Sequence, residues 1–162
     1  MSSRDRERLA EELAGEMADL QASIDAVDQV VADYLGINRT DFRALDQLAR
    51  RGRQTAGKLA EAVGISPGSL TLLLDRLTRA GYVRRVPDES NRRRVWVELT
   101  PRTWQLVDRL FSQRARAGRE RMKPYGPEQL ALVLDFIRAT NEYNASYAAW
   151  VASLPPTSGE EE

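Results

Sequence analysis

Arginine is the residue type best suited to binding chemistry in this sequence, because the chain contains no cysteine and no histidine. Seven arginines fall within residues 75–94 against three acidic residues, which gives this stretch a net charge of +4, whereas the whole chain has a net charge of zero. Guanidinium groups stay charged and bind phosphate oxygens through paired hydrogen bonds. This local excess predicts a partner that carries phosphate, since electrostatic attraction in physiological salt acts over roughly 8 Å.

The composition also excludes several function classes. Without cysteine or histidine the chain cannot form disulfides, sense redox state through a thiol, build a cysteine or histidine zinc site, or use a histidine general base. It has neither a glycine-rich phosphate loop nor a convincing carboxylate cluster, so we expect no enzyme activity, no metal and no cofactor. No apolar run approaches the roughly 20 residues of a membrane span, and the first residues lack the apolar core of a secretory signal. We therefore expect a cytoplasmic protein without membrane contact.

A helix with small residues near its start is the second feature suited to recognition. Ser66 followed by a proline predicts the helix start, because serine is a favoured N-cap and proline fits the first helical position. Small side chains at Gly68, Ser69 and Thr71 would let this end of the helix enter a DNA major groove and touch base edges. The unpaired amides of the helix end favour a phosphate, and Arg76 further along could reach the flanking backbone.

An arginine-rich loop follows this helix. Two β-type runs, at residues 82–86 and 94–99, flank a polar loop at residues 87–93 and predict a two-stranded wing whose arginines suit a narrow minor groove. Each part alone has a simpler interpretation, since a capped amphipathic helix is most often core architecture and an arginine-rich loop is most often a solvated turn. In tandem the two parts are much more specific, and their order is typical of a winged helix-turn-helix.

The remaining elements follow from periodicity and capping residues. We expect helices at about residues 5–35 (ended by Gly36), 41–51 (after an N-cap at Thr40), between Thr55 and Gly64, from Ser66 to Ala80-Gly81, at about 101–122 and at about 127–153. The predicted fold class is mainly α with a small β-wing: a winged helix-turn-helix flanked by N- and C-terminal dimerisation helices. The predicted domain organisation is an N-terminal dimerisation helix (1–35), a DNA-binding domain (36–100), C-terminal dimerisation helices (101–154) and a disordered tail (155–162).

The first predicted helix carries an apolar seam with alternating spacings of four and three residues. The seam comprises Leu13, Met17, Leu20, Ile24, Val27, Val31 and Tyr34. A helix of this length, about 45 Å, outruns a small domain core, so we expect its far end to pack on a second subunit, although an ordinary core helix remains an alternative. The predicted interface of a homodimer comprises Leu13, Met17, Leu20, Leu134, Ile137, Tyr147, Trp150 and Val151.

Residues 36–103 resemble the MarR family of winged helix-turn-helix transcriptional regulators. The resemblance rests on the motifs Gly36 to Leu45, Leu59 to Ser66, Leu74 to Leu77, Gly81 to Arg85 and Asn91 to Thr100. It implies a sequence-specific repressor that binds double-stranded DNA at a near-palindromic operator as a homodimer. It also implies a DNA-binding surface made of Ser66, Gly68, Ser69, Thr71, Arg76, Arg85, Asn91, Arg92, Arg93 and Arg94, with Arg93 at the wing tip in the minor groove.

Two positions depart from the family pattern. Asn91 stands where the family usually has an aspartate that orients the wing arginine, so a hydrogen bond to Arg93 would lack charge assistance. Thr103 replaces a common glycine after the wing, which puts the local helix geometry in doubt. Leu72 is also unusual, because the helical period places it away from the core. It could contact a thymine methyl group or cover neighbouring apolar surface.

The resemblance further implies that a small aromatic or apolar effector releases the DNA. Tyr34, Trp96, Trp104 and Phe111 could line such a pocket between the DNA-reading and dimer parts, although aromatic residues at helical spacing are more often core. The alternative function is a protein-interaction module that uses the winged helix without binding DNA, because a fold does not fix a function. A steep loss of duplex affinity with salt would favour the regulator.

Overall fold

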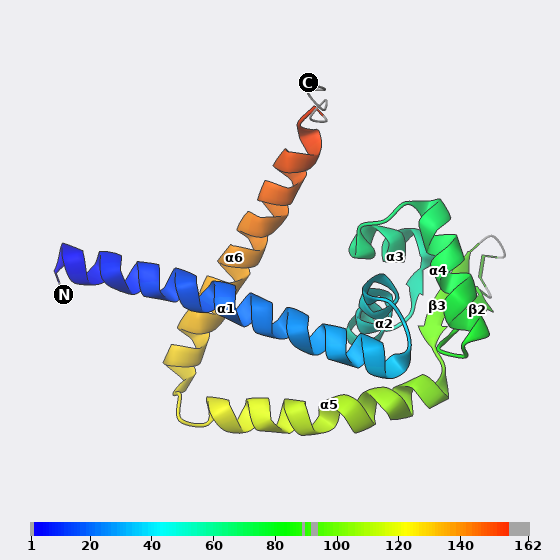
Figure 1. Cartoon of the computed structure of the whole chain (residues 1–162), viewed down its shortest axis with the longest axis horizontal. Coiled ribbons are helices and arrows are strands. Elements are labelled where there is room, and N and C mark those ends of the chain that lie inside the picture. Colours follow the sequence, from blue (N-terminus) through cyan, green and yellow to red (C-terminus); the bar gives the residue numbers. More distant parts are fainter. Residues whose placement is uncertain (1, 89, 92–93, 156–162) are drawn as a thin grey trace. The chain divides into compact units, whose positions relative to one another are not determined.

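The computed structural model describes residues 2–88, 90–91 and 94–155 (Figure 1). Within these residues the elements are α1 (Ser3–Leu35), α2 (Arg39–Arg51), β1 (Gln54–Thr55), α3 (Ala56–Val63), α4 (Pro67–Arg79), β2 (Val83–Pro87), β3 (Val95–Leu99), α5 (Pro101–Met122) and α6 (Pro127–Ser153). This order confirms the predicted class, mainly α with a small β-wing. The predicted disordered tail lies outside the described residues except for Pro155. The chain divides into two compact units, residues 1–110 and 111–162.

The core of the first unit lies between α2, α3, α4 and the small sheet. Leucines from the three helices are almost completely buried, as are one valine from each of β2 and β3. Their largest members are Leu48, Leu59, Leu70, Leu73, Leu77, Val83 and Val97. Burying an aliphatic side chain of this size stabilises a fold by roughly 1.5–3 kcal/mol. This core therefore fixes which face of each helix points outward.

The sheet has the strand order β1-β3-β2, with both pairings antiparallel. Val83 pairs with Leu99, and Val86 pairs with Trp96. Alternate residues of β3 face the core, so Val97 is buried while its neighbours Trp96 and Glu98 are only partly covered. β1 was not predicted, because two residues in a polar stretch are too short to show an alternating pattern.

The helix caps confirm most of the predicted boundaries and correct one. Thr55 and Ser66 are N-caps, and Gly36 and Gly64 end their helices with left-handed backbone (φ +66° and +75°), as predicted. The predicted N-cap Thr40 was wrong, because α2 begins at Arg39 and Asn38 caps it. The side-chain oxygen of Asn38 accepts a hydrogen bond from the Asp41 amide at 2.8 Å, and Asn38 has the extended backbone that an N-cap requires.

The predicted seam of α1 does not form the core of its own unit. Ala32 is the buried residue of this helix, whereas the seam residues Leu20 and Tyr34 are 59% and 62% exposed. In the second unit, the described part of α6 contains no buried residue, and the rings of Tyr143, Tyr147 and Trp150 follow one another along one face. No helix among the described residues is long and apolar enough to cross a membrane.

Removing the α2 cap tests the corrected helix boundary. We expect Asn38→Ala to lower the free energy of unfolding by about 1 kcal/mol, since the Asp41 amide loses its hydrogen-bond acceptor. Thr40→Ala is the matched control, and it should change the free energy of unfolding by no more than about 0.5 kcal/mol. Urea denaturation of the three proteins measures both effects. Equal losses in the two variants would contradict the assignment of Asn38.

Candidate DNA-binding site

One face of α4 is buried and the opposite face is open. Leu70, Leu73, Leu74 and Leu77 hold the helix against the core. The opposite face carries a line of residues at four- and three-residue spacing, namely Gly68, Leu72, Asp75 and Arg79. A Cβ atom added at Gly68 would meet nothing within 4 Å, so no packing contact requires the glycine. The glycine instead leaves room for another molecule to approach the helix backbone closely.

The start of α4 brings together four of the predicted DNA-binding residues, Ser66, Gly68, Ser69 and Thr71, all of which are exposed. Their polar groups already take part in local bonds. The Ser66 hydroxyl oxygen accepts from the Ser69 amide at 3.2 Å and lies 2.9 Å from the Ser69 hydroxyl. The Thr71 hydroxyl donates to the Pro67 carbonyl at 3.0 Å, which leaves its oxygen lone pairs as acceptors.

Arg76 makes a two-pronged ion pair that the sequence did not predict. Its guanidinium donates to the two carboxylate oxygens of Asp41 at 2.7 and 3.3 Å. The Asp41 side chain is 5% exposed, whereas that of Arg76 is 49% exposed. Because Arg76 donates hydrogen bonds to this carboxylate, its pKa lies above the usual arginine value. Arg76 thus links α4 to the start of α2. Asp41 lies 35 residues earlier in the chain, so no local sequence pattern could have predicted the pair.

Arg85 lies on β2 and pairs with Asp75 of α4 at 2.7 Å. Both side chains are partly exposed, and pairs of this kind contribute little, about 0–1 kcal/mol. A phosphate could therefore replace Asp75 as the partner of Arg85 at small cost. The neighbouring Arg84 pairs across the sheet with Glu98, also at 2.7 Å.

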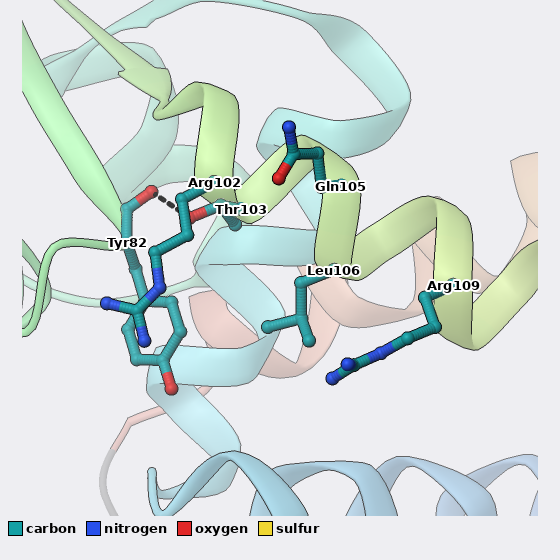
Figure 2. A pocket seen from close by; sticks show the side chains of 6 residues that line it. All are labelled: Tyr82, Arg102, Thr103, Gln105, Leu106 and Arg109. Carbon is teal, nitrogen blue, oxygen red and sulfur yellow. Dashed lines mark hydrogen bonds between the residues drawn. The ribbon is translucent and has the colours of Figure 1, made fainter.

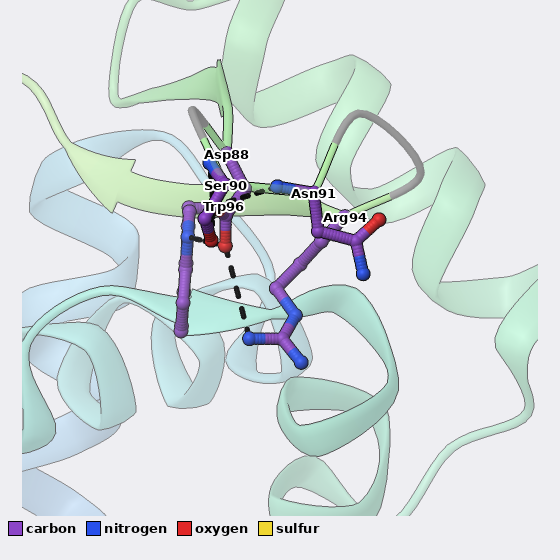
Figure 3. A network of polar contacts seen from close by, with 5 residues as sticks. All are labelled: Asp88, Ser90, Asn91, Arg94 and Trp96. Carbon is purple, nitrogen blue, oxygen red and sulfur yellow. Dashed lines mark hydrogen bonds and ion pairs between the residues drawn. The ribbon is translucent and has the colours of Figure 1, made fainter.

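The described part of the wing is organised around Asp88 (Figure 3). One carboxylate oxygen accepts from the Ser90 hydroxyl at 2.6 Å, the Ser90 amide at 2.8 Å and the Asn91 amide at 3.3 Å. The other oxygen accepts from the Trp96 indole at 2.9 Å and lies 3.7 Å from the Arg94 guanidinium. These donors, the Ser90 hydroxyl first, lower the pKa of Asp88 to about 2.

Asp88 is the wing carboxylate that sequence reasoning missed. The sequence pattern pointed to Asn91 instead, whose backbone amide donates to Asp88. An aspartate followed two residues later by serine in a turn is a known turn signal, and it could have identified the residue. Arg92 and Arg93, both predicted to contact DNA, lie outside the described residues.

Three of the four aromatic residues predicted to share an effector pocket lie in the first unit, each with different neighbours. Trp96 lies at the base of the wing, with the Arg53 and Arg94 guanidinium groups 4.9 and 5.8 Å from its ring centroid. Trp104 lines a separate hollow with Leu48, Pro101 and other residues. Tyr34 accepts a hydrogen bond from Arg109 at 3.0 Å, and Phe111 belongs to the second unit. Within the first unit Trp96 and Trp104 line different hollows, and the common pocket stays a prediction.

A different hollow, of about 340 Å³, lies beside the start of α5 (Figure 2). It is lined by Tyr82, Arg102, Thr103, Gln105, Leu106 and Arg109. Two guanidinium groups beside a tyrosine ring and a leucine suit an anion with an apolar body. The sequence did not identify these two arginines as ligand candidates. Its pattern indicated only that they belong to a helix rich in basic residues.

Thr103, which replaces the common glycine, is buried beside this hollow and does not disturb the helix. Its hydroxyl donates to the Tyr82 carbonyl at 2.8 Å, and its amide donates to the Thr100 hydroxyl oxygen at 3.2 Å. The Thr100 hydroxyl in turn donates to the Gly81 carbonyl at 2.8 Å. The two threonines therefore join the first turn of α5 to the segment between α4 and β2.

Comparisons with known proteins agree with this architecture. A sequence model described as the MarR family matches residues 37–95. The uncharacterized helix-turn-helix transcriptional regulator YcgE of Bacillus subtilis (strain 168) is 36% identical over 109 residues, which are 67% of this chain and 71% of YcgE.

Solved structures support the same fold. A MarR family protein from Bacillus stearothermophilus superposes with a TM-score of 0.63 at 22% identity, covering 86% of this chain and 97% of that one. The structure of NadR in complex with 4-hydroxyphenylacetate superposes with a TM-score of 0.60 at 22% identity, covering 77% of this chain and 89% of the other. Because the family model matches, YcgE is related along most of its length and the fold is a winged helix-turn-helix, the chain belongs to the MarR family. It is therefore a DNA-binding transcriptional regulator rather than an enzyme.

Proposed function

We propose that this protein is a repressor that binds a near-palindromic operator as a homodimer, with α4 in the major groove of each half-site and the wing in an adjacent minor groove. The observation that carries the proposal is the open face of α4. Small residues, among them Ser66 and Gly68, lie at the start of this face, and an arginine-rich wing lies beside the helix. Small residues admit the groove edges, and the unpaired amides at the start of α4 favour a backbone phosphate.

The Asp88 contacts support a wing base whose described residues are held in place before DNA arrives. Asp88 draws Ser90, Asn91 and Trp96 toward one carboxylate and attracts Arg94 to the same place. A loop already held in shape loses less conformational entropy when it enters a groove, so more of the contact energy appears as affinity. In this arrangement Arg92 and Arg93 supply the charges for the minor groove, and Arg94 serves the wing base.

The homodimer is supported by apolar side chains that the single chain leaves exposed. Leu13 and Leu20 of α1 are 46% and 59% exposed, and Trp150 of α6 is 54% exposed. Exposed apolar faces of this extent on long helices usually mark an interface. The proposed interface retains Leu13, Met17, Leu20, Leu134, Ile137, Tyr147, Trp150 and Val151. A two-fold dimer would present two α4 helices to half-sites about one helical turn apart.

An aromatic carboxylic acid is the proposed effector class. The hollow beside α5 offers Arg102 and Arg109 to a carboxylate, while Tyr82 and Leu106 offer apolar surface. NadR, which has the same fold, was solved with an acid of this class, 4-hydroxyphenylacetate. Tyr82 also donates to the Leu35 carbonyl at 2.8 Å, so a molecule bound here would touch residues linked to both α1 and the wing strands.

Adding one methyl group at Gly68 tests the role of α4. We expect Gly68→Ala to weaken binding to an operator, selected from random duplexes with the wild-type protein, by about tenfold, because the new Cβ occupies the approach to the base edges. Gly57→Ala places the same methyl group in equally open space at the second position of α3, and it is the matched control. Fluorescence anisotropy between 50 and 200 mM salt gives the affinities.

Both variants should be at least as stable as the wild type, because alanine is favoured over glycine in a helix. The control should retain the wild-type ratio of operator to random-duplex affinity. A steep fall of wild-type affinity with salt is expected, since bound arginines release counterions. Equal ratios in the two variants would remove α4 from sequence reading. A wild-type protein that binds no duplex would favour the interaction-module alternative.

The pH dependence of stability tests the Asp88 contacts. We expect Asp88→Asn to lower the free energy of unfolding at pH 7, because the variant loses the charged acceptor of the wing. The pKa of Asp88 falls from 3.8 to about 2 in the folded protein, so its contribution is complete above about pH 4 and is lost as the pH drops toward 2. Denaturation at pH 7, 4 and 2.5 should therefore show a difference between wild type and variant that shrinks with acidity. Asp108→Asn removes an exposed carboxylate of α5 and controls for the loss of one negative charge at pH 7. A difference that stays constant with pH would count against the network.

Replacing one arginine of the hollow tests the effector proposal. With operator bound, we expect 4-hydroxyphenylacetate to release the wild-type protein, and Arg109→Gln to need about tenfold more of the acid, because a charge-assisted contact with the carboxylate is lost. Anisotropy of labelled operator measures release. The neutral amide of the same acid is the control ligand and should be much less effective. Release that is the same for acid and amide, or for both proteins, would contradict an anion site here.

A further inference from the structure

Leu72 is the one leucine of α4 that is not buried, with 64% of its surface exposed. The other four leucines of the helix are nearly inaccessible, so the core leaves this side chain out. Leucine is among the residue types most often found inside proteins. Leu72 therefore stands on the outward line of α4 with most of its apolar surface open to a partner.

The neighbours of Leu72 define the kind of surface that it can meet. Along the outward line of α4, Gly68 precedes it by one turn and leaves open space. Asp75 follows it by about one turn and is paired with Arg85, and Arg79 lies about two turns after it. An apolar side chain with open space on one side, and with a paired carboxylate and two arginines (Arg85 and Arg79) beyond it on the other, suits a partner with an apolar spot flanked by negative charge. Duplex DNA offers this combination in its major groove, where thymine methyl groups lie between the phosphate backbones.

The polar groups around Leu72 are largely committed within the protein. Ser66 and Ser69 bond to each other, and the Thr71 hydroxyl donates to the Pro67 carbonyl. On the next turn, Asp75 pairs with Arg85, and Arg76 donates to the buried Asp41 carboxylate. Leu72 is thus the large apolar side chain of this face, and none of these contacts covers it. Base reading at the centre of α4 would then depend on apolar contact more than on hydrogen bonds.

We propose that Leu72 reads the C5-methyl group of a thymine in the major groove of each operator half-site. This inference rests on the proposed function, in which α4 lies in that groove. Of the four bases only thymine carries this methyl group, so burying it against leucine discriminates without a hydrogen bond. Removing one methyl group from such a contact weakens binding by about fourfold.

Uracil substitution isolates this contact, because deoxyuridine pairs as thymidine does and lacks only the methyl group. Each thymine of the selected operator is replaced in turn by uracil, and binding of the full-length wild-type protein and of Leu72→Ala is measured. We expect one thymine per half-site at which uracil weakens wild-type binding by about fourfold. At that position Leu72→Ala should bind the thymine and uracil operators equally. Leu72→Met keeps an apolar side chain and should keep most of the preference for thymine.

Leu132→Ala is the control variant, because it removes an equally exposed leucine (73% exposed) from α6. It should retain the full preference of the wild type for thymine over uracil. The Leu72 assignment is overturned if Leu72→Ala keeps that preference, or if no uracil substitution weakens wild-type binding. Either result leaves the proposed function standing when operator binding itself persists. A loss of duplex binding by the wild-type protein would overturn both proposals, and unchanged operator binding by Leu72→Ala would favour a protein partner for this side chain.

Discussion

The structure depends first on the burial of four leucines along one side of α4. Leu70, Leu73, Leu74 and Leu77 are each at most 2% exposed, so the helix cannot rotate about its axis without opening the core. This packing decides which residues face outward, because in a helix the outward line is set once the inward line is fixed. Gly68 and Leu72 are presented to a partner as a consequence of where the leucines go. The core therefore determines which side chains the exposed face of α4 presents, and a change in core packing would reorient these side chains.

Ion pairs complete this positioning and reduce the number of arginines that remain for DNA. Of the five arginines in residues 75–94 that the structure describes, four have carboxylate partners: Arg76 with Asp41, Arg84 with Glu98, Arg85 with Asp75 and Arg94 with Asp88. These pairs differ in how readily a phosphate could replace the carboxylate. The Asp41 carboxylate is buried, and removing Arg76 from it would leave an unpaired charge away from water. Asp75 is partly exposed and can return to solvent at little cost. Arg85 is thus the better candidate for a phosphate contact, and Arg76 is the better candidate for a positioning residue.

Local signals in the sequence predicted the elements well, and long-range contacts account for what was missed. Ser66 as an N-cap and Gly64 as a helix end were predictable, because a cap depends on residues within one turn. The N-cap prediction at Thr40 failed because Asn38, two positions earlier, is also a capping residue type, and only the backbone geometry distinguishes them. The Arg76 partner and the separation of Trp96 from Trp104 depend on how distant segments pack, which periodicity does not encode. Leu72 is the instructive exception, because a residue that breaks the apolar pattern of its own helix was visible from spacing alone.

The first turn of α5 is where an effector could influence the DNA-reading surface. Thr103 bonds to the Tyr82 carbonyl and Thr100 to the Gly81 carbonyl, so α5 is joined directly to the residues between α4 and β2. Tyr82 in turn donates to the carbonyl of Leu35 at the end of α1. A ligand shifts the equilibrium between two conformations of this region only to the extent that its affinities for the two conformations differ. Arg102 projects from the turn that carries these hydrogen bonds, and Arg109 is already held by Tyr34 of α1. Under the proposed function, a carboxylate that drew the two guanidinium groups together would compete with the Tyr34 contact, and this competition would make its affinity for the two conformations unequal.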